Sequence, residues 1–398
     1  MYIDLMQRLY FAQVQEALRR SRIVVLTGPR QCGKTTLARE FVSEDSLNYF
    51  DLEDPRSAAR LAEPMSVLDL LNGLVVIDEI QRMPQLFPIL RVLADRKNAR
   101  CRFLILGSVS PELMRNVSES LAGRTEAIEL TPFTAAEVPT NSWQQLWLRG
   151  GFPRSFLAKT DHDSFVWRSN YVETFLRRDL QLMGFNLSVE AIRRFWFMLS
   201  HWHGNIWNAA EPARSLGVNE TTVRRYLDIL TGLFLVRQLK PWHENLTKRQ
   251  VKAPKIYFRD SGLLHYMLGI HNMRELSLHV KFGASWEGFI LEQLIWQHRQ
   301  SQVFYWATHA GAELDLLVMH RNRRIGYEIK RADAPTLTPS MKVAFKDLRL
   351  DALFVVYPGR QAYPLAPGIQ TLPAEQVLRN QKVLPQKTAR KIKPTRIR

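Results

Sequence analysis

The sequence has few cysteines and no long apolar run. Its two cysteines, Cys32 and Cys101, are too few for a disulfide framework. No stretch approaches the ~20 apolar residues that cross a bilayer, which argues against a membrane protein. The first residues, MYIDLMQRLY, also lack the basic-then-apolar order of a signal peptide. We therefore expect a cytoplasmic protein with no membrane partner.

Acidic residues are outnumbered by basic ones. The 398 residues include 55 Lys and Arg against 38 Asp and Glu, which gives a formal charge of +17. An excess of this size favours polyanionic partners, with DNA as the expected one, although a solvated basic surface is the simpler alternative. The segment after Gln381 carries seven basic residues and no acidic one. It predicts a disordered basic tail within 376–398.

Residues 1–140 alternate short apolar runs with helical patterns, beginning with an amphipathic helix over 1–20. This alternation predicts an α/β domain with a parallel sheet. Uninterrupted apolar runs suit strands that are buried on both faces. The expected strands are 23–26, 47–50, 74–77, 103–106 and 127–130.

A glycine-rich loop follows the first expected strand and precedes the helical pattern TTLAREFV. Gly28-x4-Gly33-Lys34-Thr35 matches the P-loop, in which glycines allow backbone N–H groups to approach phosphates. Lys34 would reach the β- and γ-phosphate oxygens, and Thr35 would bind Mg²⁺. The loop thus predicts a site for ATP and Mg²⁺. The candidate nucleotide-binding residues are Gly28, Pro29, Arg30, Gln31, Cys32, Gly33, Lys34, Thr35 and Thr36.

A pair of acidic residues ends the expected strand LVVI, about 40 residues after the loop. Asp78 would hold the Mg²⁺, and Glu79 would polarise the attacking water as the catalytic acid/base. Acidic pairs at strand ends are often solvated turns. Their combination with the loop favours a hydrolysis site.

Three further positions are candidates for sensing or stabilising the γ-phosphate. Ser108 follows the strand over 103–106, where a polar side chain would sense that phosphate. Arg124, in the segment SLAGR, is the first candidate for an arginine finger across a subunit interface or for a sensor in the same subunit. Arg177 and Arg178, in YVETFLRRDL, compete with it. Each arginine has a structural ion pair as its alternative role.

The middle of the chain is predicted to be helical. Residues 141–200 form the expected helical connector, and 201–280 a winged-helix-like region. In that region AAEPARSLG and ETTVRRYLDILTGL flank a turn, and Asn219 is placed to cap the second helix. Pro212 inside the first helix puts its length in doubt.

A second acidic group lies in an expected hairpin over 313–330. Because strand side chains alternate faces, Asp315 can approach Glu328 and Lys330 on the neighbouring strand. This is the arrangement of PD-(D/E)XK nucleases, in which two acids bind Mg²⁺ and the lysine orients or activates water. Glu287, in the preceding helix, fits the additional acid of that fold. Ordinary cross-strand ion pairs are the alternative.

Taken together, these segments resemble a group of prokaryotic AAA+ ATPases that carry a C-terminal domain of unknown function with a PD-(D/E)XK-like core. The resemblance covers nearly the whole chain. It implies an AAA+ domain, a winged-helix region and a nuclease-like domain over 281–375, in that order, with ATP binding. AAA+ proteins commonly assemble in rings, so a homo-oligomer is left open. The segments are GPRQCGKTTLA, LVVIDEIQRMP, SLAGR, RGGFP, YVETFLRRDL, PKIYFRDSGLL, WEGFILEQL, GAELDLLV and GYEIK.

The functional expectation is an ATPase that couples its nucleotide state to DNA engagement by the C-terminal domains. Mg²⁺-dependent DNA cleavage is an open part of this expectation. The first alternative is an ATP-dependent DNA-binding or remodelling protein with an inactive nuclease fold. The second is a nucleotide-gated protein-interaction switch in defence or signalling.

Overall fold

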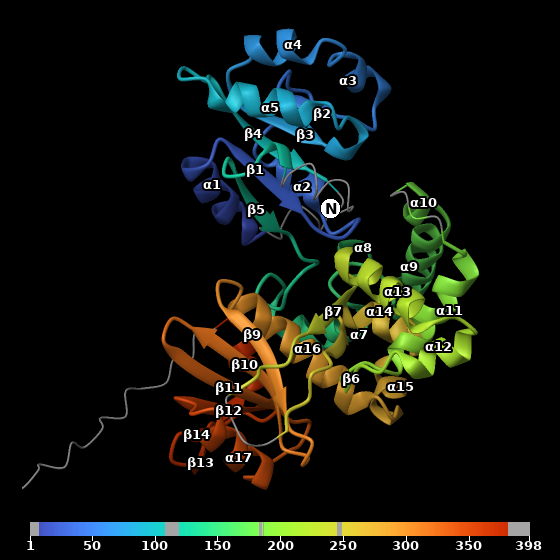
Figure 1. Ribbon diagram of the computed structural model, residues 1–398, viewed down its shortest axis with the longest axis vertical. Helices are drawn as coiled ribbons and strands as arrows, with labels where there is room; N and C mark the ends of the chain where they lie inside the picture. The colour runs from blue at the N-terminus through green and yellow to red at the C-terminus, as the bar shows by residue number, and fades with distance from the viewer. Residues whose placement is uncertain (1–7, 108–118, 183–184, 186, 245–248, 381–398) are drawn as a thin grey trace, which may run out of the picture. The chain divides into compact units, whose positions relative to one another are not determined.

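The computed structural model describes residues 8–107, 119–182, 185, 187–244 and 249–380 (Figure 1). Its contacts divide the chain into two compact units. The first comprises Met1–Gln238 and Ile256–Phe289, and the second Leu239–Lys255 and Ile290–Arg398. Among the described helices, none combines the length and apolar character needed to span a membrane. Ser108 and the expected basic tail after Gln381 lie outside the described residues.

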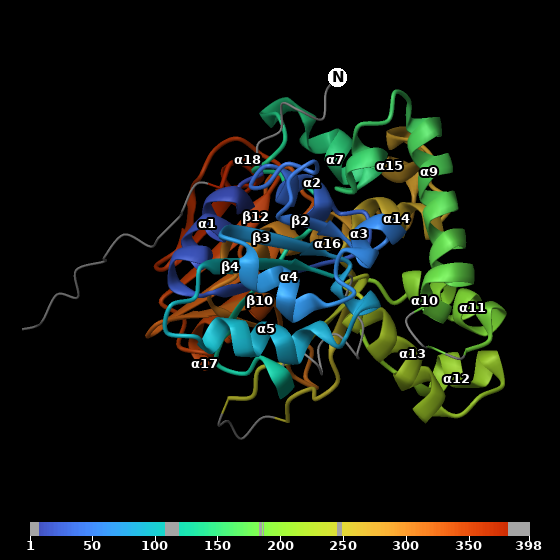
Figure 2. The same cartoon turned by 90° about the horizontal axis from the view of Figure 1, so that it is seen from above.

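The first unit opens with a parallel sheet whose strand order is β2-β3-β4-β1-β5. Each of the five expected strands is present. The apolar runs of β1, β3 and β4 are largely buried in the sheet, whereas in β5 only Ile128 is buried. Helix α1 packs on β1, and α5 packs on β4 and α4 (Figures 1 and 2). The strands are β1 Ile23–Thr27, β2 Tyr49–Asp51, β3 Gly73–Asp78, β4 Cys101–Leu106 and β5 Thr125–Glu129. The helices are α1 Tyr10–Arg20, α2 Lys34–Arg39, α3 Pro55–Ala59, α4 Pro64–Leu70, η2 Ile80–Arg82 and α5 Leu86–Asp95.

A helical region follows the sheet in the same unit. Its core contains many aromatic side chains, with Trp196 fully buried against Phe175. A π-helical segment, Phe175–Asp179, separates α9 from α10. The elements are η3 Thr140–Ser142, α7 Trp143–Arg149, α8 Pro153–Phe156, α9 Asp161–Thr174, α10 Leu180–Leu182, α11 Val189–Ser200, α14 Ser261–Met267 and α15 Met273–Leu278.

Two helices form the expected helix-turn-helix, α12 Ala210–Leu216 and α13 Glu220–Gly232. The side chain of Asn219 accepts a hydrogen bond from the Thr222 N–H at 2.8 Å, which caps α13 as the sequence predicts. Helix α12 contains Pro212 in its first turn and is seven residues long. Strands β6 Asn205–Ile206, β8 Lys255–Phe258 and β7 Val236–Leu239 form a three-stranded sheet in that order.

The segments RGGFP and FRDSGLL meet at a close backbone contact. The Asp260 carboxylate accepts hydrogen bonds from the N–H groups of Gly151 at 2.7 Å and Leu263 at 2.8 Å. Gly151 also accepts a hydrogen bond from the Phe133 N–H at 2.7 Å. A Cβ atom on Gly150 would lie 2.2 Å from the Asp260 carboxylate, and one on Gly151 would lie 2.2 Å from the Phe133 carbonyl oxygen. Glycine is therefore required at both positions.

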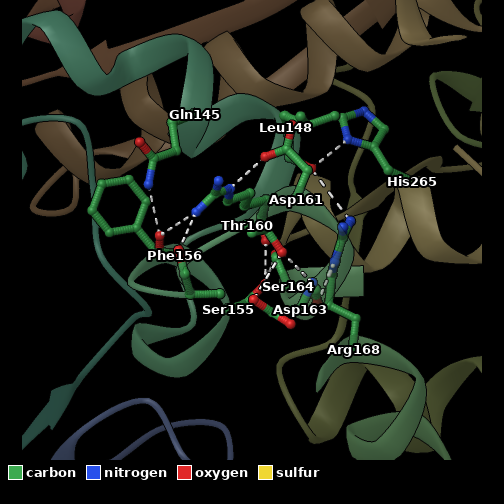
Figure 3. Close-up of polar contacts among 12 residues, drawn as sticks. Gln145, Leu148, Ser155, Phe156, Thr160, Asp161, Asp163, Ser164, Arg168 and His265 are labelled. Atoms are coloured by element: carbon green, nitrogen blue, oxygen red, sulfur yellow. Dashed lines mark hydrogen bonds and ion pairs between the residues drawn. The ribbon is translucent and has the colours of Figure 1, made fainter. Parts of the chain in front are cut away.

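Two arginines form hydrogen bonds with the helices near this contact, and Figure 3 shows one of them, Arg168, together with Leu148 and Asp161. Arg149 donates to the Asp161 carboxylate at 2.7 Å. Arg168, which is fully buried, donates to the carbonyl oxygens of Leu148 at 3.3 Å and Gly262 at 2.8 Å. Burial lowers the pKa of Arg168 to about 10, so it stays cationic at neutral pH. It thereby satisfies the Leu148 carbonyl group, which the end of α7 leaves without a helical partner, and binds a carbonyl group in the first turn of α14.

The second unit contains a mixed sheet with strand order β13-β14-β12-β11-β10-β9. The expected hairpin over 313–330 is its antiparallel pair β10 and β11, while β11, β12 and β14 run parallel. The strands are β9 Gln302–Ala307, β10 Glu313–His320, β11 Arg323–Ile329, β12 Ala352–Tyr357, β13 Pro364–Ala366 and β14 Ile369–Pro373. The remaining helices are α17 Pro339–Asp347, α18 Ala374–Leu378 and α16 Phe282–Gln297, which is divided between the two units.

The close contact at Gly151 predicts that Gly151→Ala destabilises the protein. The new methyl group overlaps backbone atoms that cannot move independently, so we expect a loss of ~3 kcal/mol of unfolding free energy, measured by urea denaturation. Gly232→Ala is the matched control, because a Cβ atom there meets nothing within 4 Å and the residue lies in α13. That control should be neutral or slightly stabilising. Equal stabilities of the two variants would contradict the prediction.

Candidate functional site

The glycine-rich loop connects the carboxyl end of β1 to helix α2. A Cβ atom on Gly28 would lie 2.2 Å from the Leu130 carbonyl oxygen, so the loop must approach that segment without a side chain. Gly33 has φ 101°, a left-handed conformation that favours glycine. Gln31 also has a positive φ of 61°, and its side chain is exposed, as is that of Thr36. The loop therefore has the tightly folded backbone that a phosphate cradle needs.

Lys34 is the buried cation of this loop. Its ammonium group donates to the carbonyl oxygens of Gly28 at 3.1 Å and Pro29 at 2.9 Å, and the residue is 5% exposed. These carbonyl groups hold the charge inside the loop, and Lys34 also lowers the pKa values of Asp78 and Glu79. Phosphate oxygens are stronger partners for an ammonium group than neutral carbonyl oxygens. Lys34 is thus placed to bind an anion in the loop.

Thr35 and Asp78 bring two oxygen atoms together beneath the loop. The Thr35 hydroxyl group donates to the Asp78 carboxylate at 2.7 Å, and the Tyr49 hydroxyl group donates to the same oxygen at 3.2 Å. Burial raises the pKa of Asp78, whereas the bond from Thr35 lowers it. Asp51 lies opposite Asp78 in the sheet and raises that pKa further. A hydroxyl group beside closely spaced carboxylates fits Mg²⁺, which prefers oxygen ligands and keeps several waters or phosphates.

Glu79 directly follows β3 and has φ 54°, an uncommon left-handed conformation for this residue type. Burial raises the pKa of Glu79, and the charge of Lys34 lowers it. The side-chain amide of Gln81 donates to its carboxylate. A partly buried carboxylate that another side chain orients is suited to act as a base toward water.

Arg8 anchors the loop from outside the motif, and the sequence analysis did not identify it. Its guanidinium group donates to the carbonyl oxygens of Cys32 at 3.0 Å and Thr131 at 2.7 Å, and to the Glu137 carboxylate at 2.8 Å. The Arg8 and Glu137 side chains are 6% and 0% exposed. The partners are more than 120 residues apart, so no local sequence pattern indicated the pair.

Both cysteines are buried and free. Burial raises the pKa of the Cys32 thiol, while the nearby charges of Lys34 and Arg8 lower it only in part. The thiol lies 3.6 Å from the Leu130 carbonyl oxygen. Burial thus favours the neutral thiol form of Cys32.

The candidate arginines lie in different surroundings. Arg124 precedes β5, which runs parallel to β1, so it lies at the amino end of the sheet and the phosphate loop lies at the carboxyl end. This placement is wrong for a sensor in the same subunit. Its guanidinium group pairs instead with Asp95 at 2.6 Å and is 39% exposed. Arg177 and Arg178 are exposed, and Arg177 pairs with Glu173 at 3.3 Å.

The second acidic group lies where the antiparallel pairing of β10 and β11 ends. The Asp315 carboxylate accepts a hydrogen bond from the Ile329 N–H at 2.8 Å, which places it beside Glu328 and Lys330 in the chain. Its other oxygen lies 3.5 Å from the ammonium group of Lys255. That lysine side chain is 3% exposed and pairs also with Glu313. The sequence analysis did not identify Lys255, whose only signal was its position before the apolar run IYF.

Glu328 and Lys330 form an ion pair at 2.6 Å. Glu287 belongs to the first unit, where it accepts a hydrogen bond from the Tyr257 hydroxyl group at 2.6 Å. Within the described part of the chain, no group of three or more His, Cys, Asp or Glu side chains is placed to hold a metal ion. The two acids of β10 and β11 and their lysine partners do not fit a complete magnesium centre.

Three family models match consecutive parts of the chain. Residues 20–139 match an AAA domain, 140–274 a domain of unknown function (DUF8612), and 282–377 a second domain of unknown function (DUF4143). The N-terminal sheet and its loop therefore form an AAA domain of the P-loop NTPase class. The two remaining models name no activity.

Two curated proteins are similar over most of the chain. They are the uncharacterized proteins Rv2008c of Mycobacterium tuberculosis and Mb2031c of Mycobacterium bovis, each 50% identical over 367 residues. Each alignment covers 92% of this chain and 83% of the relative. Among solved structures, the Walker-type ATPase PABY2304 of Pyrococcus abyssi is 16% identical at a TM-score of 0.45, covering 67% of this chain and 97% of its own. The P-loop NTPase domain of an E. coli sigma-54 transport activator is 17% identical at a TM-score of 0.23. That alignment covers 31% of this chain and 96% of the domain.

The contacts of Lys255 predict that Lys255→Met destabilises the protein by roughly 3 kcal/mol, because Asp315 then keeps a buried charge without its cation. Urea denaturation measures the loss. The double variant Lys255→Met with Asp315→Asn should regain most of it, since neither charge remains. Lys342→Met, an exposed lysine of α17, is the control and should be nearly neutral. A Lys255→Met variant as stable as this control contradicts the prediction.

Proposed function

The chain belongs to the same family as the uncharacterized mycobacterial proteins Rv2008c and Mb2031c, and we propose that it binds and hydrolyses ATP with Mg²⁺ and couples its nucleotide state to DNA engagement. The observation that carries the ATPase proposal is the contact of Thr35 with Asp78 at 2.7 Å, directly beside the buried ammonium group of Lys34. These groups come from two motifs 43 residues apart. Their convergence supports phosphate and magnesium binding at one place.

The roles follow from the geometry of these residues. Lys34 exchanges its carbonyl partners for phosphate oxygens, and the loop N–H groups bind the same anion. Thr35 and Asp78 would hold Mg²⁺, which neutralises charge on the phosphates when bound. Glu79 orients and deprotonates the attacking water, with Gln81 fixing the direction of its carboxylate. Ser108 as a phosphate sensor, and Arg124 as a finger supplied to another copy of the chain, stay parts of this proposal.

DNA engagement is supported by the charge of +17 and by the helix-turn-helix. Exposed arginines lie on both of its helices: Arg214 on α12, and Arg224 and Arg225 on α13. Arg224 pairs with Glu220 at 3.2 Å, a surface pair that phosphate groups can displace. A winged helix that reads DNA with this face is the form of the proposal that the contacts favour.

For the β10–β11 acids, we favour an inactive nuclease-like site that does not cleave DNA. Lys255 already compensates Asp315, and Lys330 compensates Glu328. A divalent cation at Asp315 would have to overcome the repulsion of the buried ammonium group beside it. The nuclease-like roles of Glu287, Asp315, Glu328 and Lys330 therefore stand as the second candidate function.

The ATPase proposal predicts that Glu79→Gln still binds ATP but turns it over at least ~10²-fold more slowly, because the general base is lost. Binding is measured with a fluorescent ATP analogue and turnover by phosphate release. Lys34→Ala should lose binding itself. Glu44→Gln, an exposed acid 58% accessible in its side chain, is the control and should behave as the wild type. Full turnover by Glu79→Gln would remove Glu79 from the mechanism.

The DNA proposal predicts that duplex affinity falls steeply with salt, and that Arg225→Ala lowers the slope of log affinity against log salt by about one. Arg349→Ala, exposed in the second unit, is the matched control. Supercoiled plasmid with Mg²⁺ or Mn²⁺ should be bound but not nicked. Nicking that disappears in Asp315→Ala and Lys330→Ala would establish the nuclease instead. If the protein does not bind DNA at any salt concentration, the alternative of a nucleotide-gated protein-interaction switch is favoured.

A further inference from the structure

Arg30 ties the phosphate loop to the helical region. It is the third residue of the loop, and its guanidinium group forms an ion pair with Asp179. The other nitrogen of the fork lies 3.7 Å from the Glu53 carboxylate. The Arg30 side chain is 23% exposed, so these contacts hold most of it away from water. A guanidinium group of the nucleotide loop is thus bound to a carboxylate of the helical region.

Asp179 depends on this partner. The residue is 2% exposed, and burial raises its pKa, whereas the charges of Arg30 and Arg178 lower it. Arg178 is exposed, and Arg30 supplies the direct ion pair. A buried carboxylate that loses its cation must move, take up a proton or admit water. Any change at Arg30 is therefore transmitted to Asp179.

Asp179 ends the π-helical segment Phe175–Asp179. Such segments are rare, and they frequently occur at functional sites. Phe175 packs edge-on against Trp196 of α11 with ring centroids 5.3 Å apart. Helix α11 in turn contacts both helices of the helix-turn-helix. A continuous series of packed elements thus leads from Arg30 to the proposed DNA-binding face.

The same ion-pair network reaches the second nucleotide motif. Glu53 pairs with Arg82 at 2.8 Å. Arg82 ends η2, the short helix that directly follows Glu79. The network therefore joins the phosphate loop, the segment after the catalytic acid and the π-helical segment, through Arg30, Glu53, Arg82 and Asp179.

We propose that Arg30 and Asp179 are positioning residues of the ATPase site, and that their ion pair reports loop occupancy to the helical region. This inference rests on the proposed ATPase function. A triphosphate in the loop brings several negative charges close to Arg30, and these compete with Asp179 for the guanidinium group. The buried Asp179 carboxylate then shifts with the π-helical segment, and α11 follows. Loss of the phosphates restores the pair.

Amide hydrogen exchange of residues 171–182 tests this inference in the full chain. ATP and Mg²⁺ are added in the Glu79→Gln background, so that the nucleotide stays intact. We expect the exchange rate in this segment to change about tenfold on ATP addition, as a locally altered helix requires. In Asp179→Asn, ATP should still bind, but the exchange rate should no longer depend on it. Arg19→Ala, an exposed arginine of α1 that pairs with Glu16, is the control and should retain the response.

Steady-state kinetics distinguish a positioning role of the Arg30–Asp179 pair in catalysis from a purely structural role. With Glu79 intact, Asp179→Asn should lower kcat about tenfold and leave KM within about threefold, because the loop is mispositioned in the reacting state. Arg30→Gln breaks the pair from the other side and should give the same pattern. It also serves as the test if Asp179→Asn does not fold.

The outcomes distinguish this inference from the ATPase proposal. If the wild-type chain binds no ATP, the proposed function is wrong. If it binds and hydrolyses ATP while exchange over 171–182 is the same with and without nucleotide, the ATPase proposal stands and the reporting role is wrong. If both variants raise exchange equally in all states and change KM alone, the pair is only a structural brace.

Discussion

The buried carboxylate of Asp260 is the interaction on which the first unit depends. It accepts the N–H group of Gly151 at the end of α7 and that of Leu263 at the start of α14. Gly151 is in turn hydrogen-bonded to Phe133, which directly follows the strands of the AAA domain. Burial raises the pKa of Asp260, and the N–H groups lower it. One carboxylate thereby fixes where the helical region begins relative to the sheet, and the path of α9 toward the phosphate loop follows from it.

In the nucleotide site, too, buried charged groups have partners that compensate their charge, and here both cations and carboxylates are involved. A buried charge must be compensated where it lies, because transfer from water is otherwise too costly. Carbonyl oxygens compensate Lys34, Glu137 compensates Arg8, and Arg30 compensates Asp179. Asp78 is different, because hydroxyl groups are its neighbours and burial raises its pKa. The charge of Lys34 lowers the pKa of Asp78 in part, and Asp78 is the carboxylate at which we propose that a metal ion binds.

The sequence predicted the features that local patterns encode. The strands β1, β3 and β4 were recognisable because each is an apolar run, and the β10–β11 hairpin because two largely apolar runs flank a polar turn. The Asn219 cap follows from a side chain that competes for the first N–H groups of a helix. Arg8, Asp179 and Lys255 were not recognisable as site residues, since their partners lie 129, 149 and 60 residues away. Arg124 was misplaced as a sensor in the same subunit because a motif does not reveal which end of the sheet it occupies.

The short segments that carry the family resemblance make contacts with one another. RGGFP contacts FRDSGLL through Gly151 and Asp260, and the phosphate loop contacts YVETFLRRDL through Arg30 and Asp179. Segments of this kind are constrained in pairs, since a change in one leaves a buried group of the other without a partner. The acids of β10 and β11 show that a motif alone does not reveal which residues from other segments lie beside it. Their spacing matches that of a nuclease. However, the ammonium group of Lys255 lies beside the Asp315 carboxylate, where it would repel a metal ion. The chemistry available to that pair of strands is therefore decided by a lysine outside the motif.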